Sequence, residues 1–346
     1  MRFNHFLSSY YPDTSYGGKN LYNDMLEQAR AADGLGYASI SIPEHHLINI
    51  LLTPAPLQMA VRLATETRNV RLVTSVAVLP LHDMRVYAGE VAMADILCDG
   101  RLVLGVGRGA FAYEMARMGC PIEGTREKFD ESLDVLMALL SEEEVSWSGK
   151  FYNFEPLTIM PRPLSEPMPQ IVMAALVPEA IYHSTLRGFH IQTTPLQGDM
   201  NKMLEQVDAF KRGKAELGAA GEHLTVSLSR VAFVVSNESE RRAKLELAYD
   251  YYSRFDNVQT GPGIVSHGAI EPLPRNQTIE EMDQNLLICT PEQMVDKLGP
   301  YAEAGIDEII FNMNIGTTQA ETLDAMQCFS EEVMPHFDDQ RRSRVA

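Results

Sequence analysis

The chain has 346 residues, 45% of them hydrophobic and 22% charged, which is enough to fill a large core. With 29 basic against 47 acidic residues, its formal net charge of −18 argues against nucleic-acid and anionic-membrane partners, because both need a basic face. The four cysteines form no C-x-x-C pair, so no metal site is predicted. With no signal peptide or membrane-spanning apolar run, the sequence predicts a reduced, cytoplasmic protein.

Eight short apolar runs recur along the chain, each with room for a helix before the next. Short runs rich in β-branched residues are typical of buried parallel strands. The predicted strands are 2–7, 37–42, 70–78, 101–106, 170–176, 189–194, 225–235 and 308–312. The predicted helices are 21–33, 56–66, 85–97, 126–140, 200–217, 240–254, one that starts at Thr290, and 319–333.

Two stretches depart from this alternation. Residues 145–169 are rich in aromatic residues and proline, and they predict an excursion with a small hairpin. Residues 256–277 are rich in glycine and proline, and a long irregular loop of this kind in a compact domain is usually a lid. The eight alternating units favour a (β/α)8 barrel with insertions over an open doubly wound sheet, with one domain over 1–346.

Residues of the types found in catalytic and ligand-binding sites follow three successive predicted strands. They are Glu44-His45-His46 after the second strand, His82-Asp83 after the third and Gly107-Arg108-Gly109 after the fourth. Reactive groups of parallel α/β folds gather where strands end, so these residues predict one shared site. A dinucleotide-binding loop is not predicted, because Ala110 stands where G-x-G-x-x-G needs its last glycine.

His45 and Glu44 are the candidate catalytic residues, because histidine exchanges protons near neutral pH and a carboxylate can fix its tautomer. The alternative is one structural histidine with a solvated neighbour. Arg108, together with Arg126 ahead of a predicted helix, forms a candidate phosphate site, since a guanidinium binds phosphate through two hydrogen bonds. Surface salt bridges are the alternative. Small Ser75 inside the third strand could leave space for a flat ligand, but from the residues alone a plain buried strand with a small neighbour is the preferred interpretation.

These residues together resemble the luciferase-like, flavin-dependent monooxygenases, the family that contains the bacterial luciferase α subunit. The match runs nearly end to end, and its order and spacing make it specific. The matching motifs are residues 2–7, Glu44-His45-His46, Val78-Leu79-Pro80, 95–109, Arg126, Thr290-Pro291-Glu292 and 332–335.

The resemblance implies a (β/α)8 barrel that binds FMN at the C-terminal ends of its strands. It implies that a separate flavin reductase supplies reduced FMN, which reacts with O2 to a C4a-peroxyflavin that attacks a small, largely apolar organic substrate. By position, His45 takes the family's active-site histidine role. Ser75 and Val76 take the position that packs against the isoalloxazine, often through a non-proline cis peptide. Arg108 and Arg126 take the phosphate contacts.

The chain departs from the family pattern at two places. Gly107 stands where luciferase has a reactive cysteine near the flavin, which weakens the case for light emission more than that for oxygenation. Around Val177 the usual hydroxyl or acidic residues are missing, so the phosphate contact there falls to backbone amides at a helix start. The alternatives are an F420-dependent oxidoreductase on the same fold and a non-catalytic flavin-binding or luciferase-like subunit. Because related barrels often pair through helices, a homodimer is expected.

Overall fold

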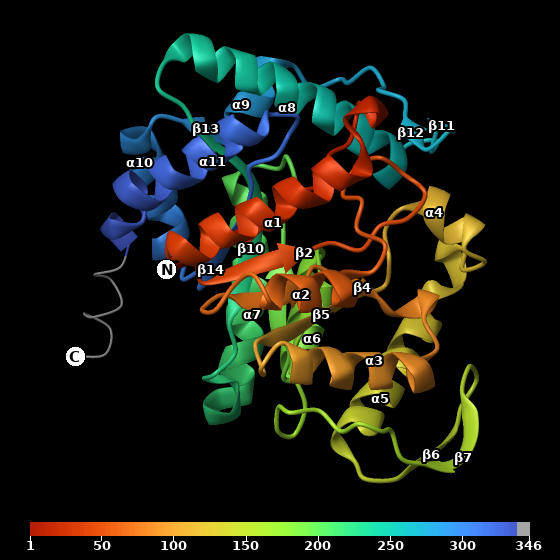
Figure 1. Cartoon of the computed structure of the whole chain (residues 1–346). Coiled ribbons are helices and arrows are strands. Elements are labelled where there is room, and N and C mark those ends of the chain that lie inside the picture. The colour runs from red at the N-terminus through yellow and green to blue at the C-terminus, as the bar shows by residue number, and fades with distance from the viewer. Residues whose placement is uncertain (338–346) are drawn as a thin grey trace.

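Eight parallel strands close into a barrel in the computed structural model, which describes residues 1–337. The first and last strands pair directly and complete the ring, with Arg2 opposite Glu308 and His5 opposite Phe311 (Figure 1). The barrel strands are β1 (Arg2–Phe6), β2 (Ser39–Ile42), β3 (Arg71–Thr74), β5 (Leu102–Gly107), β8 (Gln170–Ala174), β9 (His190–Thr193), β10 (Val226–Val234) and β14 (Glu308–Asn312). The predicted (β/α)8 barrel is confirmed. Residues 338–346 of the expected single domain lie outside the described residues.

Helices surround the strands and bury their outer faces (Figure 1). They are α1 (Gly18–Gly34), α2 (Pro56–Ala64), α3 (Met84–Leu97), α4 (Ala112–Arg117), α5 (Thr125–Ser141), α6 (Pro178–Leu186), α7 (Met200–Leu217), α8 (Glu238–Gln259), α9 (Ile279–Asp283), α10 (Pro291–Glu303) and α11 (Gln319–Cys328). Side chains of a strand alternate between its two faces. Leu72 and Leu104 therefore join the main core, whereas Val73, Val103 and Val172 form a separate apolar cluster inside the barrel.

The strand predicted over 70–78 is interrupted in the structure. β3 ends before the Ser75–Val76 peptide bond, which is cis, and the chain resumes as β4 (Ala77–Val78) beside β5. The Ser75 N–H donates to the carbonyl of Ile42 at 2.6 Å, so the interruption stays attached to β2. The β-branched composition of 70–78 predicted an unbroken strand because composition carries no information on the isomer of one peptide bond.

Two glycines let β5 pass close to this interruption. A Cβ atom on Gly105 would lie 2.0 Å from the carbonyl oxygen of Thr74, and one on Gly107 would lie 2.5 Å from Cγ2 of Val76. Both separations are far below van der Waals contact, so the packing requires residues without a side chain. The two glycines therefore serve strand packing beside the Ser75–Val76 bond.

Three segments extend the barrel. The hairpin predicted in 145–169 is present as β6 (Val145–Ser148) and β7 (Asn153–Leu157). The predicted lid-like segment, 256–277, begins inside α8 and then forms a second hairpin of β11 (Val265–Ser266) and β12 (Ala269–Ile270). Beyond it, β13 (Leu287–Cys289) adds a parallel strand beside β10. The helices α4 and α9 and the strand β13 were not predicted, whereas α6 begins where a helix start was expected, after Val177.

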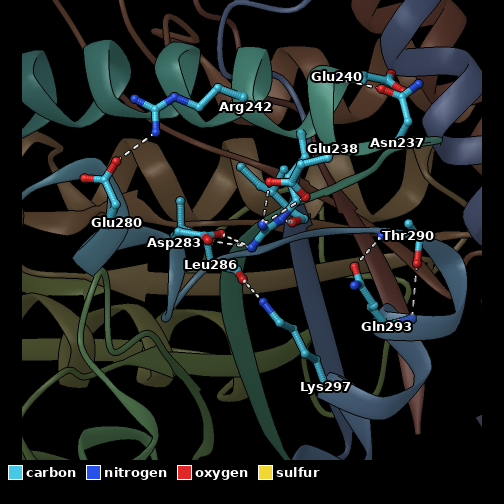
Figure 2. Close-up of polar contacts among 12 residues, drawn as sticks. Asn237, Glu238, Glu240, Arg242, Glu280, Asp283, Leu286, Thr290, Gln293 and Lys297 are labelled. Atoms are coloured by element: carbon cyan, nitrogen blue, oxygen red, sulfur yellow. Dashed lines mark hydrogen bonds and ion pairs between the residues drawn. The ribbon is translucent and has the colours of Figure 1, made fainter.

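Polar contacts hold the two sides of the lid-like segment together (Figure 2). Arg242 of α8, which precedes the segment, donates to Glu280 of α9, which follows it, at 2.8 Å. Thr290 and Gln293 then form a capping box at the start of α10, where the sequence predicted a helix N-terminus. Arg241 of α8 also contacts Asp283 of α9, so two ion pairs join the helices on either side of the lid-like segment.

Candidate active site

The predicted site residues lie at the C-terminal ends of neighbouring strands. His45 follows β2, the Ser75–Val76 bond separates β3 from β4, Gly107 ends β5 and Val177 follows β8. These four barrel strands are consecutive around the barrel. Because parallel strands deliver their C-terminal ends to one face of a barrel, the residues share one rim.

His45 is held by a carboxylate that the sequence analysis did not single out. Its Nδ1 lies 2.8 Å from Oε1 of Glu114, whose Oε2 accepts the backbone N–H of His46 at 2.7 Å. The imidazole stacks on Phe111 with ring centroids 4.3 Å apart. Because a carboxylate only accepts hydrogen bonds, this contact assigns a proton to Nδ1 and leaves Nε2 of neutral His45 as an acceptor.

Glu114 lies on α4, and its side chain is only 2% exposed. A buried carboxylate must be hydrogen-bonded, and here the imidazole of His45 and the N–H of His46 meet that requirement. The sequence offered one local signal, the helix-favouring run 112–118 soon after a strand end. That signal predicts a helix at this place, but it does not predict a contact with a histidine 69 residues away.

Glu44 contacts three donors, and His45 is not among them. Its Oε1 lies 3.0 Å from Nε2 of His46 and 2.9 Å from Nε2 of His82, while its Oε2 accepts the N–H of Val78 at 2.8 Å. Burial raises the pKa of this carboxyl, but the hydrogen bonds outweigh burial and hold the pKa below its ordinary value. Glu44 therefore ties the loop after β2 to the end of β4, and the expectation that it orients His45 is wrong.

The Ser75–Val76 bond is cis, as the family resemblance implied. The side-chain amide of Gln192 on β9 donates to Oγ of Ser75 across the barrel interior. Gln192 is itself buried, so the contact supports Ser75 from below the rim. Nothing near Gln192 in sequence marks it as a partner of the third strand, so this contact could not be predicted.

The candidate phosphate contacts are exposed. Arg108 directly follows β5, Arg126 lies in the first turn of α5, and within residues 1–337 neither arginine forms an ion pair or a side-chain hydrogen bond. Their cationic groups are therefore available to a ligand. Val177 is the N-cap residue of α6 and is 61% exposed, so the free backbone N–H groups of that helix start are close to solvent.

The lid-like segment lies beside the His45–Glu114 pair. A Cβ atom on Gly263 would lie 3.3 Å from Tyr113 of α4, and the N–H of Ile270 donates to Oδ1 of Asn49 at 3.0 Å. Figure 1 shows the β11–β12 hairpin and α4 on the same side of the molecule. The segment therefore spans from the loop after β2 to the helix that carries Glu114.

Comparison with known proteins indicates the same family as the sequence motifs. Residues 1–308 match the family model of the luciferase-like monooxygenases. The chain belongs to this family. The oxygenase component of a flavin-dependent trigonelline monooxygenase from Acinetobacter baylyi is 28% identical to this luciferase-like chain over 354 residues, which cover 99% of this chain and 98% of that one.

Two further comparisons show how broadly the luciferase-like fold is used. An F420-dependent glucose-6-phosphate dehydrogenase from Kribbella flavida is 26% identical and covers 90% of this chain and 93% of its own length. The crystal structure of the monooxygenase RslO1 from Streptomyces bottropensis superposes with a TM-score of 0.84 at 23% identity, covering 97% of this chain and 100% of that one. The second likeness shows the shared fold.

Among the helices of residues 1–337, none is long and apolar enough to cross a bilayer. In the same part of the chain, three or more His, Cys, Asp or Glu side chains nowhere come together in a way that would hold a metal ion.

Proposed function

We propose that this protein is the oxygenase component of a two-component, FMN-dependent monooxygenase that acts on a small, largely apolar organic substrate. The observation that carries the proposal is the His45–Glu114 pair on the rim that also holds the cis Ser75–Val76 bond. Reduced FMN, supplied by a separate flavin reductase, provides the chemistry: it activates O2 so that one oxygen atom passes to the substrate.

The residues of the rim fit a flavin. Gly107 lets β5 pack against the side chain of Val76 without a clash, so Val76 and the cis Ser75–Val76 bond stand together at the rim, where a planar ring system would pack on them. The cationic groups and the free N–H groups suit a phosphate. The residues that would hold the cofactor are Ser75, Val76, Gly107, Arg108, Arg126 and Val177.

The residues around His45 suit it for proton transfer away from water. With Nδ1 held by Glu114, the imidazole has Nε2 free to accept or return a proton. Phe111 covers one face of the ring and packs edge-on against Phe255 of α8 at 5.4 Å. This apolar wall and the lid-like segment beside it exclude water, which suppresses unproductive release of hydrogen peroxide.

Glu114→Gln is expected to lower kcat by about 10-fold to 100-fold, because an amide oriented toward Nδ1 no longer fixes the tautomer of His45. Steady-state kinetics with a coupled flavin reductase measure the change. Glu246→Gln, at an exposed carboxylate that contacts Arg242 on α8, is the control and should leave kcat unchanged.

Replacing Arg108 and Arg126 together with alanine is expected to raise the KM for reduced FMN by about 10-fold to 100-fold and to leave kcat within about twofold. Each arginine offers a charge-assisted hydrogen bond to phosphate that is as strong in the ground state as in the transition state. Arg212→Ala, on the exposed face of α7, serves as the control. An unchanged KM would remove these arginines from the cofactor site.

Oxygen-18 labelling tests the proposed reaction. The protein is incubated with FMN, NADH, a general flavin reductase and 18O2, and with a panel of small organic compounds that includes trigonelline, after the Acinetobacter relative. A product that carries one 18O atom supports the proposal. Hydrogen peroxide as the only product across a broad panel would contradict it.

An F420-dependent oxidoreductase is the second candidate, and the relative from Kribbella flavida favours it. The two candidates differ in cofactor and in their need for oxygen. Titration of the protein with FMN and with F420, followed by fluorescence, separates them. Tight binding of F420 together with turnover that consumes no O2 would replace the monooxygenase proposal. Flavin binding without turnover in either assay would instead favour a non-catalytic subunit.

We further propose that two copies of the chain pair through α3. The outer face of this helix carries Val86 (61% exposed), Met93 (51%) and Leu97 (50%), an apolar stripe of the kind that a symmetric interface covers. Light scattering should give twice the mass of one chain for the wild type and a reduced mass for Met93→Asp. A wild-type monomer at micromolar concentration would contradict this pairing.

A further inference from the structure

The N-terminal end of the barrel, opposite the rim of the candidate active site, holds a small cavity that polar and apolar side chains line together. Its volume is about 30 Å³, which is room for about two water-sized species, since one occupies roughly 10–15 Å³. Side chains from the first residues of several barrel strands line it, so it lies where those strands begin. They include Arg2, Arg71, Gln170, His190, Gln192 and Glu308.

Two guanidinium groups face one carboxylate in this cavity. Nε of Arg2 lies 3.6 Å from Oε2 of Glu308, whose Oε1 accepts two further hydrogen bonds. Arg71 contacts the amide oxygen of Gln170 through Nη2, and no carboxylate within residues 1–337 lies at ion-pair distance from it. A guanidinium stays protonated in proteins, and buried charges are normally paired. Partly buried Arg71 thus has no directly bonded counter-charge in the described part of the chain.

The other titratable group in the cavity is a neutral donor. Burial lowers the pKa of His190 to about 4, and the positive charges of Arg71 and Arg2 act in the same direction. Its Nδ1 accepts the backbone N–H of Thr225 at 3.1 Å, so the proton of the neutral ring lies on Nε2. Glu308 acts electrostatically on Arg71 as well as on Arg2, so two guanidiniums share one carboxylate and the lining carries one net positive charge beside the N–H donor of His190.

We propose that this cavity binds one small monovalent anion, a halide or a planar carboxylate of the size of formate or bicarbonate, on the guanidinium of Arg71. A single negative charge matches the excess charge, and the volume admits nothing much larger. Oδ1 of Asn4 and Oε1 of Gln192 are buried and accept no hydrogen bond from the described residues, so a water molecule beside the anion completes the site. Since Gln192 also donates to Ser75, the anion site supports the rim from below.

Anomalous diffraction from crystals soaked in sodium bromide tests the proposal without any substitution. Bromide carries the charge of chloride, and its anomalous signal locates it. We expect a peak in contact with the Arg71 guanidinium at the N-terminal end of the barrel. Bromide peaks elsewhere on the protein with none in this cavity would overturn the proposal. This outcome is independent of the cofactor and of the reaction.

Thermal unfolding of variants provides the second test. Arg71→Met removes the charge and keeps the apolar stem, and Arg68→Met does the same at an exposed arginine of the preceding loop. Melting temperatures are compared at equal ionic strength in 100 mM chloride or formate and in bulky gluconate. Because a bound anion stabilises the folded state, chloride or formate should raise the melting temperature of the wild type and of Arg68→Met by about 1–3 °C. The rise should vanish in Arg71→Met. An equal rise in that variant would overturn the proposal. In the wild type, a larger rise with chloride than with formate indicates a halide site, and the reverse indicates a carboxylate site.

Discussion

Replacing His45 with alanine is expected to lower kcat by about 10²-fold to 10⁴-fold and to leave the affinity for FMN within about twofold. His45 is the imidazole on the rim whose proton position is set by a buried carboxylate, so under the proposed function its loss removes the group that would exchange a proton with the reacting species. The proposed phosphate contacts lie on other elements and would remain intact. Product formation with a coupled flavin reductase gives kcat, and fluorescence titration gives the FMN affinity.

His183→Ala is the matched control for this experiment. His183 lies exposed on α6, where it contacts Glu179 and the ring of Tyr182 on the same helix, so its removal should not affect turnover. The His45→Ala variant should also release a larger share of consumed O2 as hydrogen peroxide, because reaction with the substrate slows while O2 still reacts with the flavin. Turnover above one third of the wild-type value would remove His45 from the reaction.

Replacing Glu44 with glutamine is expected to lower the free energy of unfolding by about 2–4 kcal/mol near pH 6. The carboxylate accepts three hydrogen bonds, from His46, His82 and Val78. A glutamine amide has one oxygen and one NH2 group, so at least one buried donor would face another donor, which costs more than the lost bond alone. Urea denaturation measures the change. Glu66→Gln, at a partly buried carboxylate paired with two exposed arginines, is the control and should have a much smaller effect.

The difference in the free energy of unfolding between the wild type and Glu44→Gln should also depend on pH. The pKa of Glu44 is lowered in the folded protein, so its contribution is present above its ordinary value of about 4.5 and is lost as the pH falls. The hydrogen bond with Glu44 raises the pKa of His46. The contribution of His46 to the free energy of unfolding is therefore complete below about pH 6.5 and is lost as the pH rises. The difference should therefore be largest between about pH 4.5 and 6.5. A difference that stays constant from pH 4 to pH 9 would contradict this assignment.

The barrel could be predicted from sequence because a local sequence pattern marks each of its strands. Each strand is a short apolar run, and a closed parallel sheet buries both faces of such runs, so eight of them separated by helices leave few other arrangements. The rim followed from the same logic, since His45, Gly107 and Arg108 stand where predicted strands end. The cis bond at Ser75–Val76 came from the family resemblance and not from composition.

The partners within the site could not be predicted, because they depend on contacts between distant segments. His45 and Glu44 are adjacent, yet their side chains diverge: one meets Glu114 on α4, and the other bonds to His82 after β4. Neighbours in a loop need not point the same way, and no periodicity reveals where they point. The cavity behind Arg71 was hidden for the same reason, since its lining comes from the first residues of strands far apart in sequence.

A crystal structure of the protein with FMN tests the central claim most directly. We predict that the isoalloxazine ring packs against the Ser75–Val76 bond at the C-terminal rim, that its phosphate lies near Arg108 and Arg126, and that the imidazole of His45 faces the ring system. Flavin bound at any other place, or a His45 side chain turned away from it, would contradict the account.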